Sequence, residues 1–140
     1  MQTLLMLNDY AGLLKPRLSM AVAAAAAAGY LLAAGTADLG AGVVFACVLS
    51  IAAGAACLNN CQDRDLDAGM ARTRNRPLPA GRIPRLPALV VALALLIAGG
   101  LGLSAGPFPL PAAAVAAAAA LLYNGIYTPL KRRTSLALLP

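Results

Sequence analysis

The chain has 140 residues, of which 61% are hydrophobic and 11% are charged. Soluble domains carry about 25% charged residues, so the composition argues against a soluble domain and excludes a disordered chain. The sequence lacks His, which excludes a histidine base, a histidine metal ligand and a serine–histidine triad. The net charge of +6 is compatible with nucleic acid, an anionic membrane surface or a phosphorylated substrate as a partner.

Four apolar stretches reach the roughly 20 residues that a membrane-crossing helix needs. They lie at about 18–37, 39–58, 86–106 and 110–128, with a loop at about 59–85. No long linker separates them, so we expect one transmembrane domain over 1–140. The sequence predicts an all-α fold, a polytopic transmembrane helix bundle with four spans. We expect no signal peptide, because Lys15 and Arg17 come late and no cleavage site ends the first apolar run.

The eleven positive residues all fall on one side of this four-span topology. Two precede the first span, six lie between the second and third spans, and three follow the fourth. They are Lys15, Arg17, Arg64, Arg72, Arg74, Arg76, Arg82, Arg85, Lys131, Arg132 and Arg133. Because positive loops stay in the cytoplasm, we expect a cell (inner) membrane protein with both termini and the central loop cytoplasmic. This placement indicates a lipid bilayer and a phosphorylated substrate, and no nucleic acid.

Polar residues with helical spacing end the second span. Asn59, Asp63 and Asp67 are four residues apart and would share one face of a helix. Stacked carboxylates repel each other, and hard oxygen ligands without nitrogen or sulfur suit Mg²⁺. The pattern therefore indicates a magnesium site. The alternative is a solvated helix end whose acids pair with Arg64 or Arg72.

An arginine-rich loop follows this acidic face. Four arginines fall within the eleven residues 72–82, where Pro and Gly interrupt any helix. Arginine binds phosphate with two parallel hydrogen bonds, so acids followed by arginines suit a metal-bound diphosphate. The alternative is a loop that contacts anionic lipid headgroups, a role we expect for Arg82 and Arg85.

A third polar cluster follows the fourth span and shares the cytoplasmic face by topology. Lys131 could reach a phosphate, and Tyr123 and Tyr127 could donate hydrogen bonds or line an apolar groove. The alternative is a tyrosine belt followed by a basic stop, which is common at membrane interfaces.

These motifs resemble the intramembrane UbiA-type prenyltransferases. The similarity is carried by Asn59-x-x-x-Asp63-x-x-x-Asp67 and the run Arg72-Thr73-Arg74-Asn75-Arg76-Pro77-Leu78. The residues that favour the protoheme IX farnesyltransferase (heme O synthase) branch are Leu14-Lys15-Pro16-Arg17-Leu18, Asn59-Asn60, Asp63-Arg64-Asp65-Leu66-Asp67 and Lys131-Arg132-Arg133-Thr134. A quinone-type branch would more usually place Asp directly after the first Asn, where this chain has Asn60.

The resemblance implies an all-helical bundle with about twice as many spans as this chain. The family also carries a second aspartate-rich motif that binds a second Mg²⁺, and this sequence has no such motif. The similarity thus covers nearly the whole chain and about the first half of the family's fold. It implies transfer of a farnesyl group from farnesyl diphosphate to a vinyl group of heme B, giving heme O and diphosphate. The acceptor follows from the resemblance alone.

The resemblance also implies roles for the candidate residues. Asn59, Asp63 and Asp67 would hold Mg²⁺ on the diphosphate, with Asp63 and Asp67 counted as catalytic. The cations Arg72, Arg76 and Lys131 would neutralise the charge that grows on the leaving group, with Arg72 and Lys131 counted as catalytic. Tyr127 would join these cations in binding the diphosphate.

Other functions remain open. The chain could use a quinone-precursor acceptor, or be a non-catalytic membrane fragment that keeps one diphosphate half-site. It could also be a small transporter or channel subunit, although the positive charges of 72–76 would oppose a cation route. Four spans leave room for a homo-oligomer such as a two-fold dimer, but no motif specifies one.

Overall fold

A computed structural model describes residues 2–106, 108 and 110–131 of the chain. Within these residues every regular element is a helix, which confirms the all-α prediction. The helices are α1 (Gln2–Leu14), α2 (Pro16–Ala34), α3 (Leu39–Gly69), α4 (Arg85–Ala105), α5 (Leu110–Leu121), the π-helix η1 (Leu122–Tyr127) and α6 (Thr128–Leu130). Four helical stretches, α2, α3, α4 and the continuous run Ala112–Leu130, are long and apolar enough to cross a membrane, as predicted.

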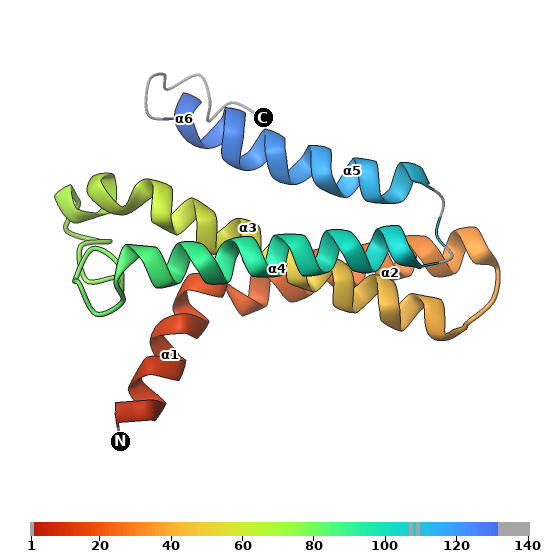
Figure 1. Cartoon of the computed structure of the whole chain (residues 1–140), viewed down its shortest axis with the longest axis horizontal. Coiled ribbons are helices and arrows are strands. Elements are labelled where there is room, and N and C mark those ends of the chain that lie inside the picture. Colours follow the sequence, from red (N-terminus) through yellow and green to blue (C-terminus); the bar gives the residue numbers. More distant parts are fainter. Residues whose placement is uncertain (1, 107, 109, 132–140) are drawn as a thin grey trace.

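The spans run side by side along the long axis of the molecule, and α1 projects from the start of α2 (Figure 1). Helix α3 packs most extensively against α4 and next against α2. The run α5–η1–α6 makes few contacts with the rest. Helix α3 continues to Gly69, well past the apolar stretch that predicted it, so the acidic segment is part of a long helix.

Small residues allow α3 and α4 to approach closely. A Cβ atom added at Gly54 would lie 2.8 Å from the carbonyl oxygen of Ala92. One added at Gly99 would lie 2.6 Å from the carbonyl oxygen of Cys47. Ser50 also donates a hydrogen bond to the carbonyl of Leu95, at 3.0 Å. Small residues commonly let membrane helices pack backbone to backbone, and this pair does so.

The tightest apolar core lies where α1, α3, α4 and the 70–84 loop meet. Its buried members are Leu13, Cys57, Cys61, Leu78, Ile83, Ala88 and Ala92. The amide of Asn60 ties α1 to this core by donating to the carbonyl of Leu13, at 2.9 Å. Helix α1 was not among the predicted elements, because its 13 residues form no apolar block of membrane length. The core therefore fixes the loop and α1 against the end of α3.

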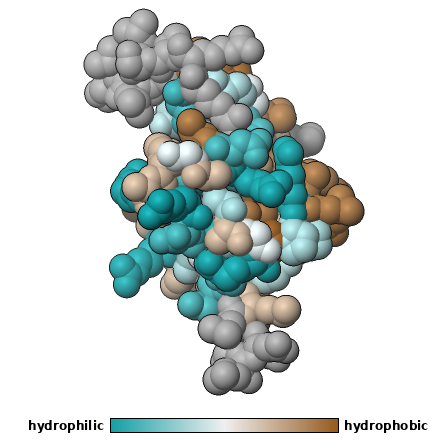
Figure 2. All heavy atoms as spheres, turned by 90° about the vertical axis from the view of Figure 1, so that its left-hand side faces the viewer, coloured by the Kyte–Doolittle hydropathy of each residue, from teal (hydrophilic) through white to brown (hydrophobic). Residues whose placement is uncertain are grey.

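The two ends of the bundle differ in charge. The start of α2, the end of α3, the start of α4 and the end of α6, which carry the basic residues, lie toward one end (Figure 1). Figure 2 views this end and shows polar side chains gathered over it, with apolar atoms toward its margins. At the opposite end Asp38 caps α3 by accepting a hydrogen bond from the backbone N–H of Gly40, at 2.7 Å. Candidate functional chemistry is thus confined to the end that carries the loop.

Candidate functional site

One face of the last part of α3 carries the three predicted acidic and amide residues. Asn59, Asp63 and Asp67 are only 3%, 6% and 4% exposed, whereas Asp65 on the other side of the helix is exposed. The four-residue spacing therefore places the three side chains on the buried face of α3. Buried carboxylates require compensating charge, because leaving an ion unpaired away from water is costly.

Two cations from distant segments provide this charge. The Nζ atom of Lys131 lies 2.5 Å from an Oδ2 oxygen of Asp63, although 68 residues separate the two in sequence. The guanidinium of Arg76 donates to Oδ2 of Asp67 at 2.8 Å. The alternative interpretation of the sequence named Arg64 or Arg72 as partners of the acids. The fold instead brings the loop and the end of the fourth span onto the acidic face.

Hydrogen bonds fasten the end of the fourth span to the same face. The Asn59 amide donates to Oγ1 of Thr128 at 2.7 Å, and the Gln62 amide donates to the carbonyl of Asn124 at 3.0 Å. Thr128 in turn donates to the carbonyl of Tyr123 at 2.8 Å. These carbonyls belong to the π-helix η1, whose wider turn shifts backbone groups out of the α-helical pattern. The π turn thus supplies the Asn124 carbonyl that joins η1 to α3 and the Tyr123 carbonyl that holds Thr128.

Tyr127 contacts the lysine of the site. The rings of Tyr123 and Tyr127 stack with centroids 5.8 Å apart. Nζ of Lys131 lies 5.8 Å from the centroid of the Tyr127 ring, within the range of a cation–π interaction. Tyr127 therefore orients Lys131 beside Asp63.

Not every predicted arginine joins this cluster. Arg72 is exposed and has no hydrogen-bond or ion-pair partner among residues 2–106, 108 and 110–131. Arg82, expected to face lipid, instead donates to both carboxylate oxygens of Asp9, at 3.1 and 3.0 Å. Arg132 and Arg133 lie outside the described residues. Among the described residues, Arg76 and Lys131 are the cations paired with the acids, and a third cation lies near them.

The third cation is Lys15, which sequence reasoning did not place in the site. Burial lowers the pKa of Lys15 below its ordinary value of 10.5, and the positive charges of Arg76 and Lys131 lower this pKa further. The carboxylates of Asp63 and Asp67 oppose that shift. All four groups therefore lie within electrostatic reach of Lys15. The signals in the sequence were its position directly before a membrane span and a proline, and its place in the run Leu14-Lys15-Pro16-Arg17-Leu18 that contributes to the family resemblance.

The backbone of Lys15 is also unusual. Its φ of 48° and ψ of 60° place it in the left-handed region, which residues other than glycine seldom adopt. Such conformations cost of order 1–3 kcal/mol and persist only where the surrounding structure enforces them. Here the sharp turn between α1 and α2 enforces it, with Ser19 donating to the carbonyl of Leu14 at 2.8 Å. The turn aims the lysine toward the acidic face of α3.

The donor set of the site fits magnesium. It consists of hard oxygens from Asn59, Asp63 and Asp67, and no group of three His, Cys, Asp or Glu side chains converges within the part of the chain that the structure describes. Mg²⁺ is typically bound by one or two carboxylates together with substrate phosphates and water, and does not need a complete protein cage. The residues present therefore fit a metal that is shared with an anionic substrate.

An apolar cavity begins beside this polar cluster. It has a volume of about 240 Å³ and lies between α2, α3, α5 and η1. Ser19 and Tyr123 line it together with aliphatic residues that include Leu18, Ala55 and Ala120. A second cavity of about 520 Å³ continues toward the opposite end of the bundle, and both are lined by Val48, Ala116 and Ala119. The smaller cavity adjoins the polar cluster through Tyr123, whose ring stacks on that of Tyr127 beside Lys131, and the lining of both cavities is mainly apolar.

Relatives of known name match this chain over part of their length. A protoheme IX farnesyltransferase of Oleidesulfovibrio alaskensis is 40% identical over 134 residues, which cover 96% of this chain and 47% of the relative. One of Geobacter sulfurreducens is 45% identical over 126 residues, covering 90% and 46%. One of Pyrobaculum neutrophilum is 46% identical over 95 residues, covering 66% and 34%. The chain spans less than half the length of these relatives. No solved structure matches it.

A family model matches most of the chain directly. The model of the UbiA prenyltransferase family matches residues 20–139, which include the acidic face of α3, the arginine loop and the fourth span. Together with its four apolar helices, this match makes the chain a multi-pass membrane protein. The chain belongs to the UbiA prenyltransferase family.

Proposed function

We propose that this chain forms the donor half-site of an enzyme that transfers a farnesyl group from farnesyl diphosphate to a vinyl group of heme B. The farnesyl group adds to the vinyl group together with hydroxide taken from water, so the products are heme O, diphosphate and a proton. The observation that carries the proposal is the junction of two opposite environments. Buried acids and three cations lie beside an apolar cavity that is lined by Tyr123, the stacking partner of Tyr127, and a prenyl diphosphate has a matching charged head and apolar chain.

In the structure the site residues neutralise one another. Asp63 is paired with Lys131, and Asp67 with Arg76. A diphosphate would exchange these partners, with Lys131 and Arg76 turning to phosphate oxygens while Asn59, Asp63 and Asp67 hold Mg²⁺. The bound metal supplies Lewis acidity that stabilises negative charge on the diphosphate. Because the metal would replace the cations beside the acids, ligand binding would not leave the buried acids uncompensated.

The chain's own groups would then promote departure of the diphosphate. As the allylic C–O bond breaks, its electron pair goes to the diphosphate oxygen. Lys131, Arg76 and Lys15 would stabilise that oxygen electrostatically. Arg72, exposed on the loop, would reach the outer phosphate, and Tyr127 would orient Lys131 toward it. The apolar cavity would keep water from the prenyl cation until the vinyl group attacks it. Water would then add to the cation formed on the former vinyl group and lose a proton, which gives the hydroxyl group of heme O.

The relatives and the topology support the remaining parts of the proposal. Relatives named protoheme IX farnesyltransferase support heme B as the acceptor, in preference to a quinone precursor. The one-sided basic residues support the cell (inner) membrane, with the site and both ends of this chain on the cytoplasmic side. We propose one transmembrane domain over 1–140 that supplies the first aspartate-rich motif, and leave room for a homo-oligomer.

Binding of farnesyl diphosphate tests the donor site. The natural polypeptide that contains this chain is purified in detergent, and binding is measured by calorimetry with and without Mg²⁺. Asp63→Asn should weaken Mg²⁺-dependent binding by about tenfold or more, because it removes a charged ligand. Asp65→Asn is the matched control: it removes the same charge from the exposed side of α3 and should change binding little.

Two results would count against the proposal. Equal effects of the two substitutions would show that only general charge near α3 matters. Binding that does not depend on Mg²⁺ would remove the metal from the site. Tight donor binding without heme O formation by the natural polypeptide would instead favour the non-catalytic half-site.

A further inference from the structure

The two apolar cavities between the spans form one groove along α3. The smaller, of about 240 Å³, and the larger, of about 520 Å³, are both lined by Val48 of α3 and by Ala116 and Ala119 of α5. Helix α2 lines both cavities as well, from Leu18 near its start to Ala34 at its end. An apolar chain can therefore lie along α3 from one end of the bundle toward the other.

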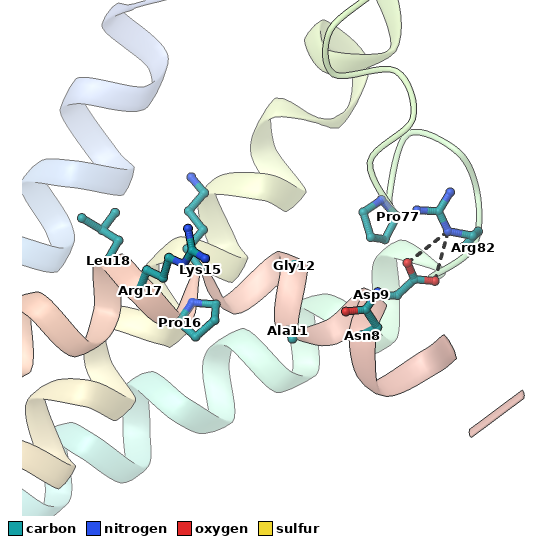
Figure 3. Close-up of a pocket in the computed structure, with 10 residues that line it drawn as sticks. All are labelled: Asn8, Asp9, Ala11, Gly12, Lys15, Pro16, Arg17, Leu18, Pro77 and Arg82. Carbon is teal, nitrogen blue, oxygen red and sulfur yellow. Dashed lines mark hydrogen bonds and ion pairs between the residues drawn. The ribbon is translucent and has the colours of Figure 1, made fainter. Parts of the chain in front are cut away.

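One end of this groove adjoins the candidate site. Tyr123 lines the smaller cavity, and its ring stacks on that of Tyr127 beside Lys131. Leu18 also lines this cavity, and Figure 3 shows Leu18 and Lys15 extending to the same side at the start of α2. A prenyl chain whose diphosphate is held by the cations would consequently enter the groove at this end.

Two aromatic rings end the groove at the opposite end of the bundle. Tyr30 of α2 and Phe108, which precedes α5, both line the larger cavity. Their rings meet edge to face, with centroids 5.7 Å apart, an arrangement that aromatic pairs favour. Apart from Ser19 and Tyr123 at the polar end, the remaining lining residues of both cavities are Ala, Val, Leu or Ile. The aromatic pair thus supplies the bulk at the far end of the groove.

Contacts on both sides hold the pair in place. The Tyr30 hydroxyl donates to the carboxylate of Asp38, at 3.1 Å from Oδ1 and 3.2 Å from Oδ2. Asp38 is itself fixed, because it caps α3. The ring of Phe108 lies against Gly106, where an added Cβ atom would clash with it. The two rings are therefore fixed in the path of a chain that follows the groove.

The length of the groove can be compared with that of prenyl chains. Tyr30 follows Ser19 by 11 residues, so the two lie about 16 Å apart along α2. An extended chain advances about 1.2 Å per bond, so each isoprene unit of four bonds adds about 4.8 Å. A farnesyl chain then measures about 14 Å and a geranylgeranyl chain about 19 Å. Three units fit between the polar end and the aromatic pair, whereas a fourth would meet the rings.

We propose that Tyr30 and Phe108 determine the length of the prenyl donor, by ending the groove after three isoprene units. The inference rests on the proposed function, because it places the chain of a prenyl diphosphate in the groove. Lipid acyl chains of about 16 carbons are also apolar, but at about 1.2 Å per bond they exceed the groove in length. Donor length is thus selected at one end of the bundle, and the reaction proceeds at the other.

Removal of one ring tests the aromatic stop. In the natural polypeptide that contains this chain, calorimetry with Mg²⁺ measures the dissociation constants of farnesyl and geranylgeranyl diphosphate. Phe108→Ala should lower the geranylgeranyl-to-farnesyl ratio of these constants about tenfold, because the fourth unit gains apolar contacts. Phe45→Ala is the matched control, since Phe45 is the other phenylalanine of the chain and lines neither cavity. An unchanged ratio in Phe108→Ala, or the same change in both variants, would overturn the proposal.

A second variant narrows the groove. Ala116 lines both cavities, so Ala116→Phe places a ring where they meet and should weaken farnesyl diphosphate binding about tenfold. Dimethylallyl diphosphate, with one isoprene unit, should bind as before, because its chain ends within the smaller cavity. Ala117→Phe is the control, because Ala117 is exposed and lines neither cavity. Equal weakening of both donors by Ala116→Phe would exclude the groove as the path of the chain.

Asp63→Asn separates this inference from the proposed function. If that variant binds farnesyl diphosphate as the wild type does but Phe108→Ala changes the length preference, the groove is supported and the donor site is refuted. If Asp63→Asn weakens binding but Phe108→Ala leaves the length preference unchanged, only the aromatic stop is refuted. The two proposals can therefore fail independently.

Discussion

The helix pair α3–α4 and the run α5–η1–α6 are held in place by different means. Between α3 and α4, glycines bring backbones into direct contact along the spans. The second region makes few contacts with its neighbours and is joined to α3 by polar side chains at one end, through Asn59, Gln62 and Asp63. The scaffold therefore depends on the close fit of helix backbones, whereas the candidate site depends on polar contacts that a ligand can exchange.

The largest loss of stability is expected from a substitution that forces α3 and α4 apart. Gly99→Ala places a Cβ atom 2.6 Å from both the Cys47 carbonyl oxygen and Ile51 Cγ1, so the helices must separate. We expect a loss of about 3 kcal/mol in the free energy of unfolding. Gly100→Ala is the control, because nothing lies within 4 Å of its added Cβ and the gain in helix propensity is the same. Denaturation in detergent, followed by circular dichroism, measures both, and equal stabilities would refute the close packing.

The next largest loss of stability is expected from removing the ion pair between Lys131 and Asp63, which joins the run α5–η1–α6 to α3. Lys131→Met leaves the buried carboxylate of Asp63 without its lysine. Removing one partner of a fully buried pair costs about 3–5 kcal/mol, and we expect about 2 kcal/mol because a fifth of the lysine side chain is exposed. Adding Asp63→Asn should restore part of this loss. A double variant that is less stable than Lys131→Met by the full cost of Asp63→Asn would show that the two residues do not interact.

A smaller effect is expected at the hydrogen bond between α3 and α6. Thr128→Val keeps the shape but removes the oxygen that accepts from Asn59 and the proton donated to Tyr123. The free energy of unfolding should fall by about 1–2 kcal/mol, since a buried amide loses its acceptor. Hydrogen exchange in η1 should also become faster. Thr36→Val, in an exposed turn at the other end, should change neither measurement.

The smallest effect concerns Lys15 and pH. Its pKa is lower in the folded protein than the ordinary 10.5, so the unfolded chain binds more protons between those two values. The stability contributed by Lys15 therefore rises with pH across that window and is constant below the folded-state pKa. The difference in unfolding free energy between the wild type and Lys15→Met, followed from neutral pH to 10.5, should shift in favour of the wild type. A shift in the opposite direction would contradict the burial of this charge.

Helical periodicity was sufficient to predict the spans and the acidic face. Long apolar runs have few stable alternatives to membrane helices, and the spacing of Asn59, Asp63 and Asp67 requires only regular α-helix. Both features depend on residues that are close in sequence. Asp65, two residues from both Asp63 and Asp67, is exposed on another face of the same helix, as regular helix geometry requires.

Features that depend on distant segments could not be predicted in this way. The alternative to a magnesium site paired the acids with Arg64 or Arg72, but tertiary packing brings Arg76 and Lys131 to them. The π-helix η1 (Leu122–Tyr127) has no local signature in the sequence and is joined to α3 by the hydrogen bond from Gln62 to the Asn124 carbonyl. Lys15 enters the site through a left-handed turn that a lysine before proline does not favour by itself.

The length of α3 determines how deep the acidic face lies. Its 31 residues extend about 46 Å, which exceeds the roughly 30 Å hydrocarbon layer of a bilayer. With Leu39 at one boundary of that layer, Asn59 comes about 30 Å along the helix, at the other boundary, and Asp67 about 12 Å beyond it. A lipid-soluble substrate could thus react without leaving the hydrocarbon, while its released diphosphate would enter water directly. The extra turns of one helix would separate the two products into two phases.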